Sequence, residues 1–314
     1  MLDIVIIGGG PIGLYAGVLA SLHNLNGIIF EARDVKGGQL NLYPEKTVID
    51  LPGHLSLTAD EFEKLMEKQL LEKPNHPEIH MCESVDTFVK DGDHYIVKTR
   101  EGEYQTRTIL IASGMGNAQP RKPGLPGEDQ YKNIIYALRD KSLCEGKKVV
   151  ILGGGDSAVD MANLVVDLTA SLSIVHRRNE FRAQSSSVEK LKASRAKIYV
   201  PYNTTALIGK DDRLTGVEIT NNETQEKKIL EADLLFVNFG MVPAQNDFPL
   251  EKNGMNIVTY DFFMTSLENV FAVGNTINYP GKVKNITCGM GEAVVAVTKI
   301  DQIINPGKNI PVHF

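Results

Sequence analysis

Two glycine-rich loops have the spacing of dinucleotide-binding turns. The first contains Gly8, Gly10 and Gly13, with Pro11 between them, after the apolar run LDIVII. Glycines in this spacing permit a tight turn, close approach of a pyrophosphate and close packing of the following helix on the strand. Glu31 ends the next expected strand, 23 residues after Gly8 (31 − 8). A carboxylate at that point accepts hydrogen bonds from the ribose of an adenosine.

The second loop repeats the pattern with a different charge at the strand end. It supplies Gly153 and Gly155, and the offset of 23 residues (153 + 23 = 176) leads to His176 instead of a carboxylate. Arginines follow, and a guanidinium group binds phosphate oxygens through two parallel hydrogen bonds. A solvated basic run is the alternative interpretation, but the contrast with the first loop favours a 2′-phosphate. We therefore expect an NADPH site made by Gly153, Gly155, Asp156, Ser157, Arg177, Arg178 and Arg182.

The two loops belong to an internal repeat of a strand, a turn, a helix and a second strand. Residues 57–72 have the pattern of an amphipathic helix that begins near Thr58, and residues 82–113 and 204–237 alternate like β meanders. The Pro- and Gly-rich segment 119–129 is typical of a linker. The sequence predicts an α/β fold with two Rossmann-like, three-layer ββα dinucleotide-binding domains. The second domain, 118–245, is inserted in the first, 1–117 and 246–314.

Composition limits the classes of function. The 314 residues are 42% hydrophobic with a formal net charge of −6, a poor charge for binding nucleic acid. No apolar run approaches the roughly 18 residues that span a bilayer, and no basic segment or cleavage site opens the chain, so we expect a cytoplasmic protein without a membrane partner. The three cysteines are far apart and form no metal-binding cluster, so no metal site is expected.

The chain resembles the thioredoxin reductase-like flavoproteins over nearly its whole length. The resemblance rests on GGGPIGLYA, TILIASG, GGGDSAVD, VHRRNEFRA and VFAVGN, which occur in the order usual in that family. GGQLNLYPEK, GKVKNITCGMGEAVVAV and the tail with His313 are similar to one branch, the ferredoxin/flavodoxin–NADP reductases. Where thioredoxin reductases carry a redox-active CxxC, this chain has only Cys144. Since one thiol cannot form an internal disulfide, electrons must leave the flavin directly.

The resemblance implies FAD in the domain 1–117 and 246–314, and NADPH in the domain 118–245. It places Glu31 at the FAD ribose, Gln39 and Tyr43 against the flavin, and Val85 at the adenine. Asn275 stands where the family usually has an aspartate that binds the ribityl chain. The implied FAD site comprises Gly8, Gly10, Pro11, Gly13, Glu31, Gln39, Tyr43, Val85, Ala118 and Asn275, with His313 or Phe314 over the other flavin face.

The resemblance also implies a reaction. NADPH transfers a hydride to FAD, and the electrons then pass singly to ferredoxin or flavodoxin. The cofactors carry this chemistry, so no protein acid or base is expected. A homodimer is implied as well. Lys282 and Lys284 are candidate contacts for the acceptor, with ordinary surface charge as the alternative interpretation. Two alternatives stay open: an NADPH oxidase or diaphorase without a dedicated protein acceptor, and a flavin-bound redox sensor with negligible turnover.

Overall fold

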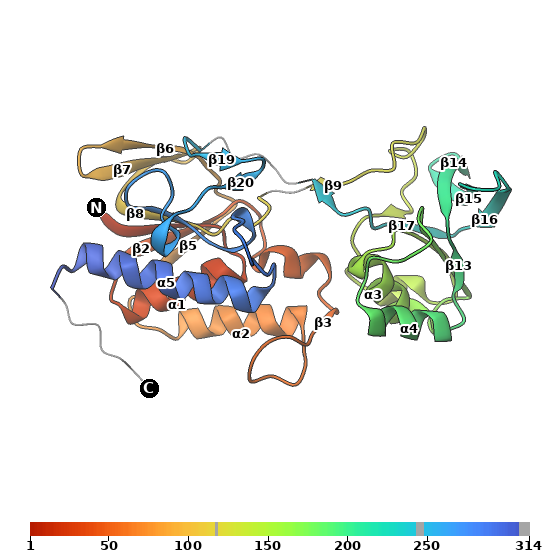
Figure 1. Cartoon of the computed structure of the whole chain (residues 1–314), viewed down its shortest axis with the longest axis horizontal. Coiled ribbons are helices and arrows are strands. Elements are labelled where there is room, and N and C mark those ends of the chain that lie inside the picture. The colour runs from red at the N-terminus through yellow and green to blue at the C-terminus, as the bar shows by residue number, and fades with distance from the viewer. Residues whose placement is uncertain (117–118, 243–247, 308–314) are drawn as a thin grey trace. The chain divides into compact units, whose positions relative to one another are not determined.

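The computed structural model describes residues 1–116, 119–242 and 248–307 (Figure 1). The chain divides into two compact units. The outer unit comprises Met1–Ala118 and Pro243–Phe314, and the inserted unit comprises Gln119–Val242. The second unit is therefore inserted in the first, as the predicted fold class requires.

The outer unit is built on a parallel sheet in the order β5-β2-β1-β8-β21. Strand β8 pairs with two strands along one of its edges. Its first half pairs antiparallel with β7, and its second half pairs parallel with β21. The antiparallel strands β6, β7 and β8 form the predicted meander. The main strands are β1 (Leu2–Ile7), β2 (Gly27–Glu31), β5 (Glu78–Met81), β6 (Val85–Asp91), β7 (His94–Thr99), β8 (Glu103–Ile111) and β21 (Val270–Ala272).

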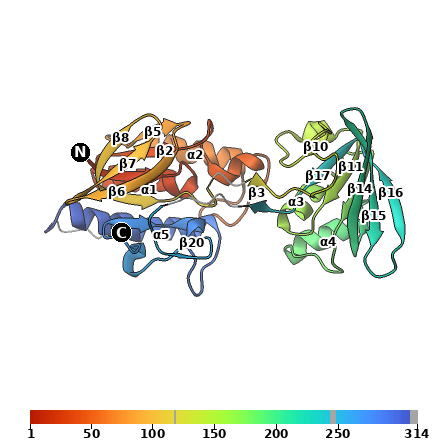
Figure 2. The same cartoon turned by 90° about the horizontal axis from the view of Figure 1, so that it is seen from above.

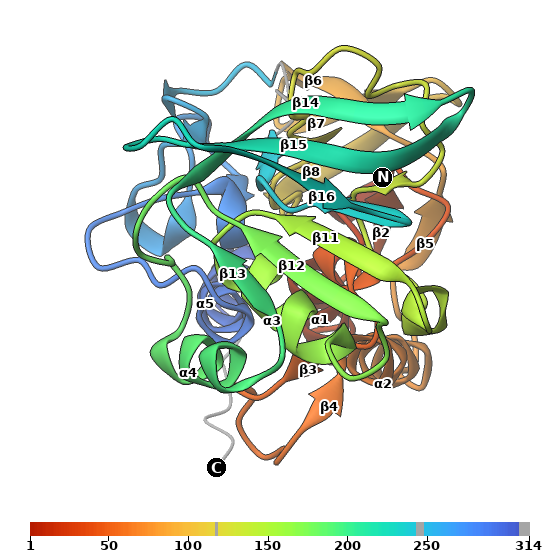
Figure 3. The same ribbon diagram turned by 90° about the vertical axis from the view of Figure 1, so that its right-hand side faces the viewer.

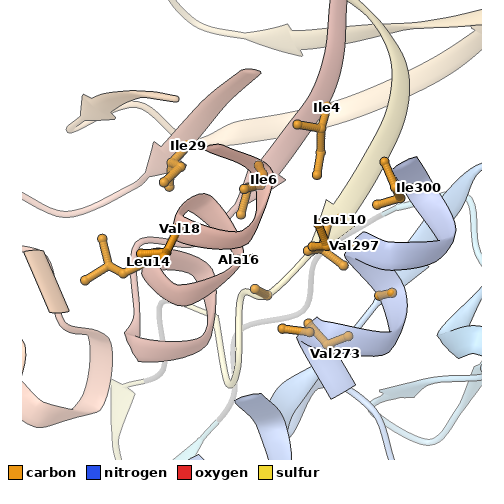
Figure 4. Packing of buried hydrophobic residues seen from close by; sticks show 14 of the residues in the cluster. Ile4, Ile6, Leu14, Ala16, Val18, Ile29, Leu110, Val273, Val297 and Ile300 are labelled. Atoms are coloured by element: carbon orange, nitrogen blue, oxygen red, sulfur yellow. The ribbon is translucent and has the colours of Figure 1, made fainter. Parts of the chain in front are cut away.

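Three helices cover one face of this sheet, below it in Figure 1, and the meander covers the other. They are α1 (Pro11–Leu22), α2 (Ala59–Leu71) and α5 (Ile286–Ile304). Because side chains alternate along a strand, Ile4 and Ile6 of β1 face the helices, whereas Val5 and Ile7 face the meander. Figure 4 shows Ile4 and Ile6 beside apolar side chains of α1 and α5. Each fully buried aliphatic side chain of this kind stabilises the fold by about 1.5–3 kcal/mol.

Local signals account for the helix that was predicted near Thr58. The Thr58 side chain accepts a hydrogen bond from the Glu61 backbone N–H, and the Glu61 side chain accepts one from the Thr58 backbone N–H. This reciprocal capping box satisfies two backbone donors at the start of α2 and confirms the predicted helix. Short elements complete the outer unit: η1 (Gly38–Leu42), β3 (Thr47–Val48), β4 (Leu57–Thr58), β19 (Lys252–Asn253), β20 (Asn256–Ile257), η3 (Asp261–Phe263) and η4 (Gly274–Thr276).

The inserted unit repeats the three-layer plan. Its parallel sheet has the order β10-β17-β11-β12-β13, with an antiparallel sheet β14-β15-β16 on one face and α3 and α4 on the other (Figures 2 and 3). The elements are β9 (Gln119–Pro120), β10 (Ile134–Ile135), η2 (Lys141–Cys144), β11 (Lys148–Leu152), α3 (Asp156–Val165), β12 (Ser171–Val175), α4 (Ser185–Ala193), β13 (Lys197–Tyr199), β14 (Tyr202–Lys210), β15 (Arg213–Asn221), β16 (Lys227–Glu231), β17 (Leu234–Val237) and β18 (Met241–Val242).

Two sequence-based expectations need correction in this unit. The segment 204–237 is not one meander: β14 to β16 are antiparallel, but β17 leaves them and pairs parallel with β11 and β10. Its apolar run LLFV suits a strand that is covered on both faces. The predicted linker 119–129 also begins with structure, because β9 pairs with β18 and both ends of the inserted unit lie side by side. In the described ranges, no helix is long and apolar enough to cross a membrane.

Candidate functional site

A cavity of about 350 Å³ lies in the outer unit at the carboxyl ends of its parallel strands. Residues that follow β1, β2, β5, β8 and β21 line it, because parallel strands all end at the same edge of a sheet. The cavity therefore collects side chains that are distant in sequence. Seven of the residues predicted for the FAD site line it: Gly8, Gly10, Pro11, Glu31, Gln39, Val85 and Asn275.

The three glycines of the first loop have different structural roles. Gly8 has a φ of +113° and lies against Ala112, so a Cβ there would come within 2.7 Å of the Ala112 carbonyl oxygen. A Cβ at Gly13 would lie 1.8 Å from the carbonyl oxygen of Gly8. At Gly10 the nearest atom to such a Cβ is 3.8 Å away, on Gly38. Gly10 thus leaves space at the start of α1, where the backbone N–H groups attract anions.

Glu31 is held rigidly at the end of β2. Its Oε2 accepts a hydrogen bond of 2.9 Å from the Gly9 backbone N–H, and its Oε1 accepts one of 3.0 Å from the Arg33 backbone N–H. The Arg33 guanidinium lies 3.6 Å from the same carboxylate. An ionised carboxylate can accept about four hydrogen bonds, so Glu31 retains acceptor capacity toward the cavity.

Two of the predicted FAD-site residues that the structure describes, Gly13 and Tyr43, do not line this cavity. Gly13 packs against Gly8 beneath the loop. Tyr43 is half-buried at the end of η1, so its contact with the flavin stays a prediction. Ala118 lies outside the described residues, as do His313 and Phe314.

The cavity also contains residues that sequence reasoning missed. Some of them follow β2, β5 or β8, and the rule that ligands bind at the carboxyl ends of parallel strands would have found those. Others come from distant loops. They include Arg33, Gly38, Leu40, Glu83, Ser84, Ser113, Gly114, Met115, Gly116, Phe248 and Ile286.

Glu83 is the most strongly bound of these additional side chains. Burial raises its pKa, but hydrogen bonds from Thr99 (2.6 Å), His80 (2.8 Å) and Tyr104 (2.9 Å) outweigh that effect, so the pKa of Glu83 is lowered. The carboxylate therefore stays ionised beside the cavity and anchors the segment that leads to Val85.

The second glycine loop, at the end of β11, has the same division of roles. A Cβ at Gly153 would lie 2.5 Å from the Asn238 carbonyl oxygen, and one at Gly154 would lie 2.3 Å from the His176 ring. At Gly155, by contrast, a Cβ would meet nothing within 4 Å. Helix α3 begins at the next residue, so Asp156 and the exposed Ser157 lie in its first turn, where the helix N-terminus favours an anion.

The arginine run is tied to this loop through its backbone. The Arg182 N–H donates a hydrogen bond of 2.6 Å to the Gly154 carbonyl, and the Gln184 N–H donates one of 2.9 Å to the Asp156 side chain. The side chains of Arg177, Arg178 and Arg182 are exposed, and none pairs with a carboxylate in the described part of the chain. Three guanidinium groups are therefore available to a phosphate beside the open position of Gly155.

His176 contributes shape instead of charge. Its ring packs under Gly154 and stacks on Phe181 with an interplanar angle of 16°. Burial lowers the pKa of His176, and the charges of Arg177 and Arg182 act in the same direction. The imidazole is thus neutral near pH 7, and the positive charge at this strand end belongs to the arginines.

The burial of Lys282 contradicts its predicted role as a contact for the acceptor. Lys282 is not a surface contact for an acceptor: its side chain is 1% exposed and forms an ion pair with Glu292. Lys284 is exposed.

Cys144 is completely buried, and burial raises the pKa of its thiol to about 11. The described residues contain no group of three or more His, Cys, Asp or Glu side chains that could hold a metal ion.

The family model described as pyridine nucleotide-disulphide oxidoreductase matches residues 2–298. The chain therefore belongs to this family. Its curated relatives include the ferredoxin–NADP reductase of Streptococcus sanguinis, 39% identical over 99% of this chain and 97% of the relative. The ferredoxin–NADP reductase of Acholeplasma laidlawii is 37% identical over 98% of this chain and 96% of that protein.

A solved structure agrees with this relationship at the level of the fold. The thioredoxin reductase of Lactococcus lactis covers 97% of this chain and 99% of its own length, with a TM-score of 0.85 and 26% identity. The predicted resemblance to ferredoxin–NADP reductases of the thioredoxin reductase-like type is confirmed, and so is the predicted fold class.

Proposed function

We propose that this chain is an FAD-dependent oxidoreductase that transfers electrons between NADPH and ferredoxin or flavodoxin. The observation that carries the proposal is the contrast between two glycine loops in a chain related over its full length to ferredoxin–NADP reductases. One loop leads to the carboxylate of Glu31, and the other leads to the exposed arginines at 177 and 178. A carboxylate suits a free ribose, whereas guanidinium groups suit a 2′-phosphate.

The cavity of the outer unit has the chemistry that FAD requires. When bound, FAD accepts a hydride and returns the two electrons one at a time. Gly10 leaves room for the pyrophosphate at the start of α1, and Glu31 is fixed where it can accept the ribose hydroxyl groups. Val85 and Asn275 line the same cavity, where Val85 would contact the adenine and Asn275 would offer an uncharged amide to the ribityl chain. Gln39 and Tyr43 would lie against the flavin.

The second loop would hold NADPH in the inserted unit. Gly155 leaves the space for the pyrophosphate, and Asp156 and Ser157 stand at the start of α3. The arginines at 177, 178 and 182 would bind the 2′-phosphate. Neutral His176 supports the loop from below without competing for that phosphate.

The chemistry of Cys144 supports direct transfer from the flavin to a protein acceptor. It is the one cysteine in the sequence of the inserted unit, and one thiol cannot form a disulfide within that unit. Its raised pKa also keeps it protonated, and a protonated thiol is a poor nucleophile. We therefore propose no dithiol relay of the thioredoxin reductase kind. We further propose that the protein is a cytoplasmic homodimer, with His313 or Phe314 over the flavin.

The test is reduction of cytochrome c by the purified protein with NADPH as donor and ferredoxin as the titrated component. We expect the rate to rise and saturate with ferredoxin or, in a parallel titration, with flavodoxin. A protein that is bleached by NADPH but whose rate is indifferent to both carriers would be a diaphorase. A protein that binds FAD and is not bleached by NADPH would be a sensor, and either result would overturn the proposal.

A further inference from the structure

A buried polar cluster lies behind the turn that carries Asn275. Three side chains converge on Oε1 of Glu292 in α5: the Tyr279 hydroxyl donates a hydrogen bond of 2.7 Å, Lys282 forms an ion pair, and the Cys288 thiol lies at 3.4 Å. The Lys282 and Glu292 side chains are 1% and 2% exposed. A lysine and a glutamate this deeply buried are unusual, because each charge loses its hydration.

The other oxygen of Glu292 reaches the cavity wall. Its Oε2 accepts a hydrogen bond of 2.7 Å from the backbone N–H of Gly274. Gly274 has a φ of +77° and, with Asn275, lines the cavity of the outer unit. One carboxylate therefore connects helix α5 to the Val273–Gly274 peptide group, one residue before Asn275.

Lys282 supplies the opposite charge beside this buried carboxylate. Without a cation, a buried carboxylate takes up a proton or draws in water, and in either case its hydrogen-bonding pattern changes. Burial raises the pKa of Tyr279, and its hydrogen bond to Glu292 raises it further, so the phenol remains a donor. The Lys282 ammonium also lies 5.4 Å from the centre of the Tyr279 ring. The cluster therefore has a complementary partner for each oxygen of Glu292.

Helix α5 offers an internal comparison. Asp301, nine residues further along (301 − 292), is also buried, and its Oδ2 lies 2.7 Å from Nδ1 of His23 at the end of α1. Neither His23 nor Asp301 lines the cavity. Helix α5 thus carries two buried carboxylates with partners, and only Glu292 contacts the cavity wall.

We propose that Lys282 and Glu292 are positioning residues for the flavin, acting through the backbone of Gly274 on the placement of Asn275. The ion pair sets the direction of the Val273–Gly274 peptide, and Gly274 in turn sets where the Asn275 amide meets the cavity. This inference rests on the proposed function, since it takes FAD as the occupant of that cavity. Support of a ligand-binding group by a buried neighbouring pair is how many sites obtain their precision.

The experiment measures FAD affinity by flavin fluorescence on titration of the apoprotein, and visible circular dichroism of the bound flavin. The variants are Glu292→Gln, Lys282→Met, the double variant and Asp301→Asn. We expect each single change at the pair to weaken FAD binding by about tenfold or more and to alter the visible spectrum. In the double variant, FAD binding should weaken by less than the product of the two single-variant factors, because the two residues act as a unit. Asp301→Asn should lower the thermal midpoint and leave both FAD readouts unchanged.

A purely structural role would give the opposite pattern. If Glu292→Gln and Lys282→Met lower the thermal midpoint as Asp301→Asn does, with FAD affinity within about twofold of the parent, the inference is wrong. Tyr279→Phe removes one hydrogen bond and keeps the ion pair, so it remains informative if a charge variant does not fold; about threefold weaker binding is expected. Failure of the parent protein to bind FAD would overturn the proposed function itself, which separates the two outcomes.

Discussion

Gly13 packs so closely on Gly8 that a Cβ at Gly13 would lie 1.8 Å from the Gly8 carbonyl oxygen. Gly10, between them, has no atom closer than 3.8 Å to the corresponding position. The loop therefore contains glycines that the fold requires and one that leaves room beside the chain. The motif predicts a turn at Gly8, space for a pyrophosphate at Gly10 and helix packing at Gly13, and the distances in the structure agree with these separate roles.

Substitution by alanine tests this separation. We expect Gly13→Ala to lower the free energy of unfolding by about 1–3 kcal/mol, because the helix must move away from the strand. Gly10→Ala should leave that free energy nearly unchanged and weaken FAD binding by about tenfold or more, since its methyl group occupies the space for the pyrophosphate. Urea unfolding of the apoproteins and FAD titration measure the two effects. Equal destabilisation by both substitutions would contradict the assignment.

Nucleotide specificity should depend on the exposed arginines. The change of Arg177 and Arg178 to alanine removes charged hydrogen bonds to a 2′-phosphate, so the KM for NADPH should rise by about 100-fold. The KM for NADH, which lacks that phosphate, should change by less than about threefold. Arg213→Ala, an exposed arginine on β15, is the matched control and should alter neither value. Steady-state kinetics with both nucleotides decides the point, and equal effects on both would remove the 2′-phosphate assignment.

Glu83 should make the stability of the outer unit depend on pH. Its pKa is lowered in the folded protein, so it contributes stability above its unfolded pKa and loses that contribution as the pH falls through the folded pKa. The difference in unfolding free energy between the parent and Glu83→Gln should be largest at neutral pH and should shrink in acid. Urea unfolding of the apoproteins across this range measures it. Glu72→Gln, at an exposed position, is the control, and a pH-independent difference at Glu83 would refute the prediction.

The buried thiol should be chemically silent. Because burial raises the pKa of Cys144 to about 11, a thiol reagent at pH 8 should not modify it in the native protein, whereas exposed Cys82 should react. Cys82→Ser should remove the fast phase of labelling, and Cys144→Ala should leave that phase unchanged. The ferredoxin-dependent rate of Cys144→Ala should stay within about twofold of the parent. Loss of electron transfer in this variant would indicate a thiol relay after all.

Local signals predicted the elements well where the pattern is complete within one segment. The capping box at Thr58 and Glu61 and the repeated glycine loops depend on residues a few positions apart, so the chain shows them directly. The alternating pattern of residues 204–237 predicts one meander, but β17 pairs with β11, about 85 residues earlier (234 − 149). Parallel pairing over such a distance leaves no periodic signal in sequence.

The residues of the candidate site also differ in whether the sequence alone identifies them. Glu31 and the arginines at 177 and 178 could be identified from their fixed distance to a glycine loop. Glu83 and Ser113 have no such spacing and required the rule that ligands bind at the carboxyl ends of parallel strands, whereas Phe248 comes from a distant loop that carries no signal in the sequence. Lys282 was interpreted as an exposed lysine, which is the usual state of that residue type, and only the position of Glu292 on α5 makes it a buried partner.

By itself the sequence determined the two nucleotide loops, the opposite charges at the ends of the strands that follow them, the insertion of one unit in another and the absence of a dithiol. Each of these depends on covalent spacing or residue identity, which folding does not alter. The tertiary structure alone decided which carboxylates are buried and which lysine is paired. Burial and proximity arise from packing between segments far apart in the chain, so the residues that position a site become visible only when the sheet and its helices are assembled.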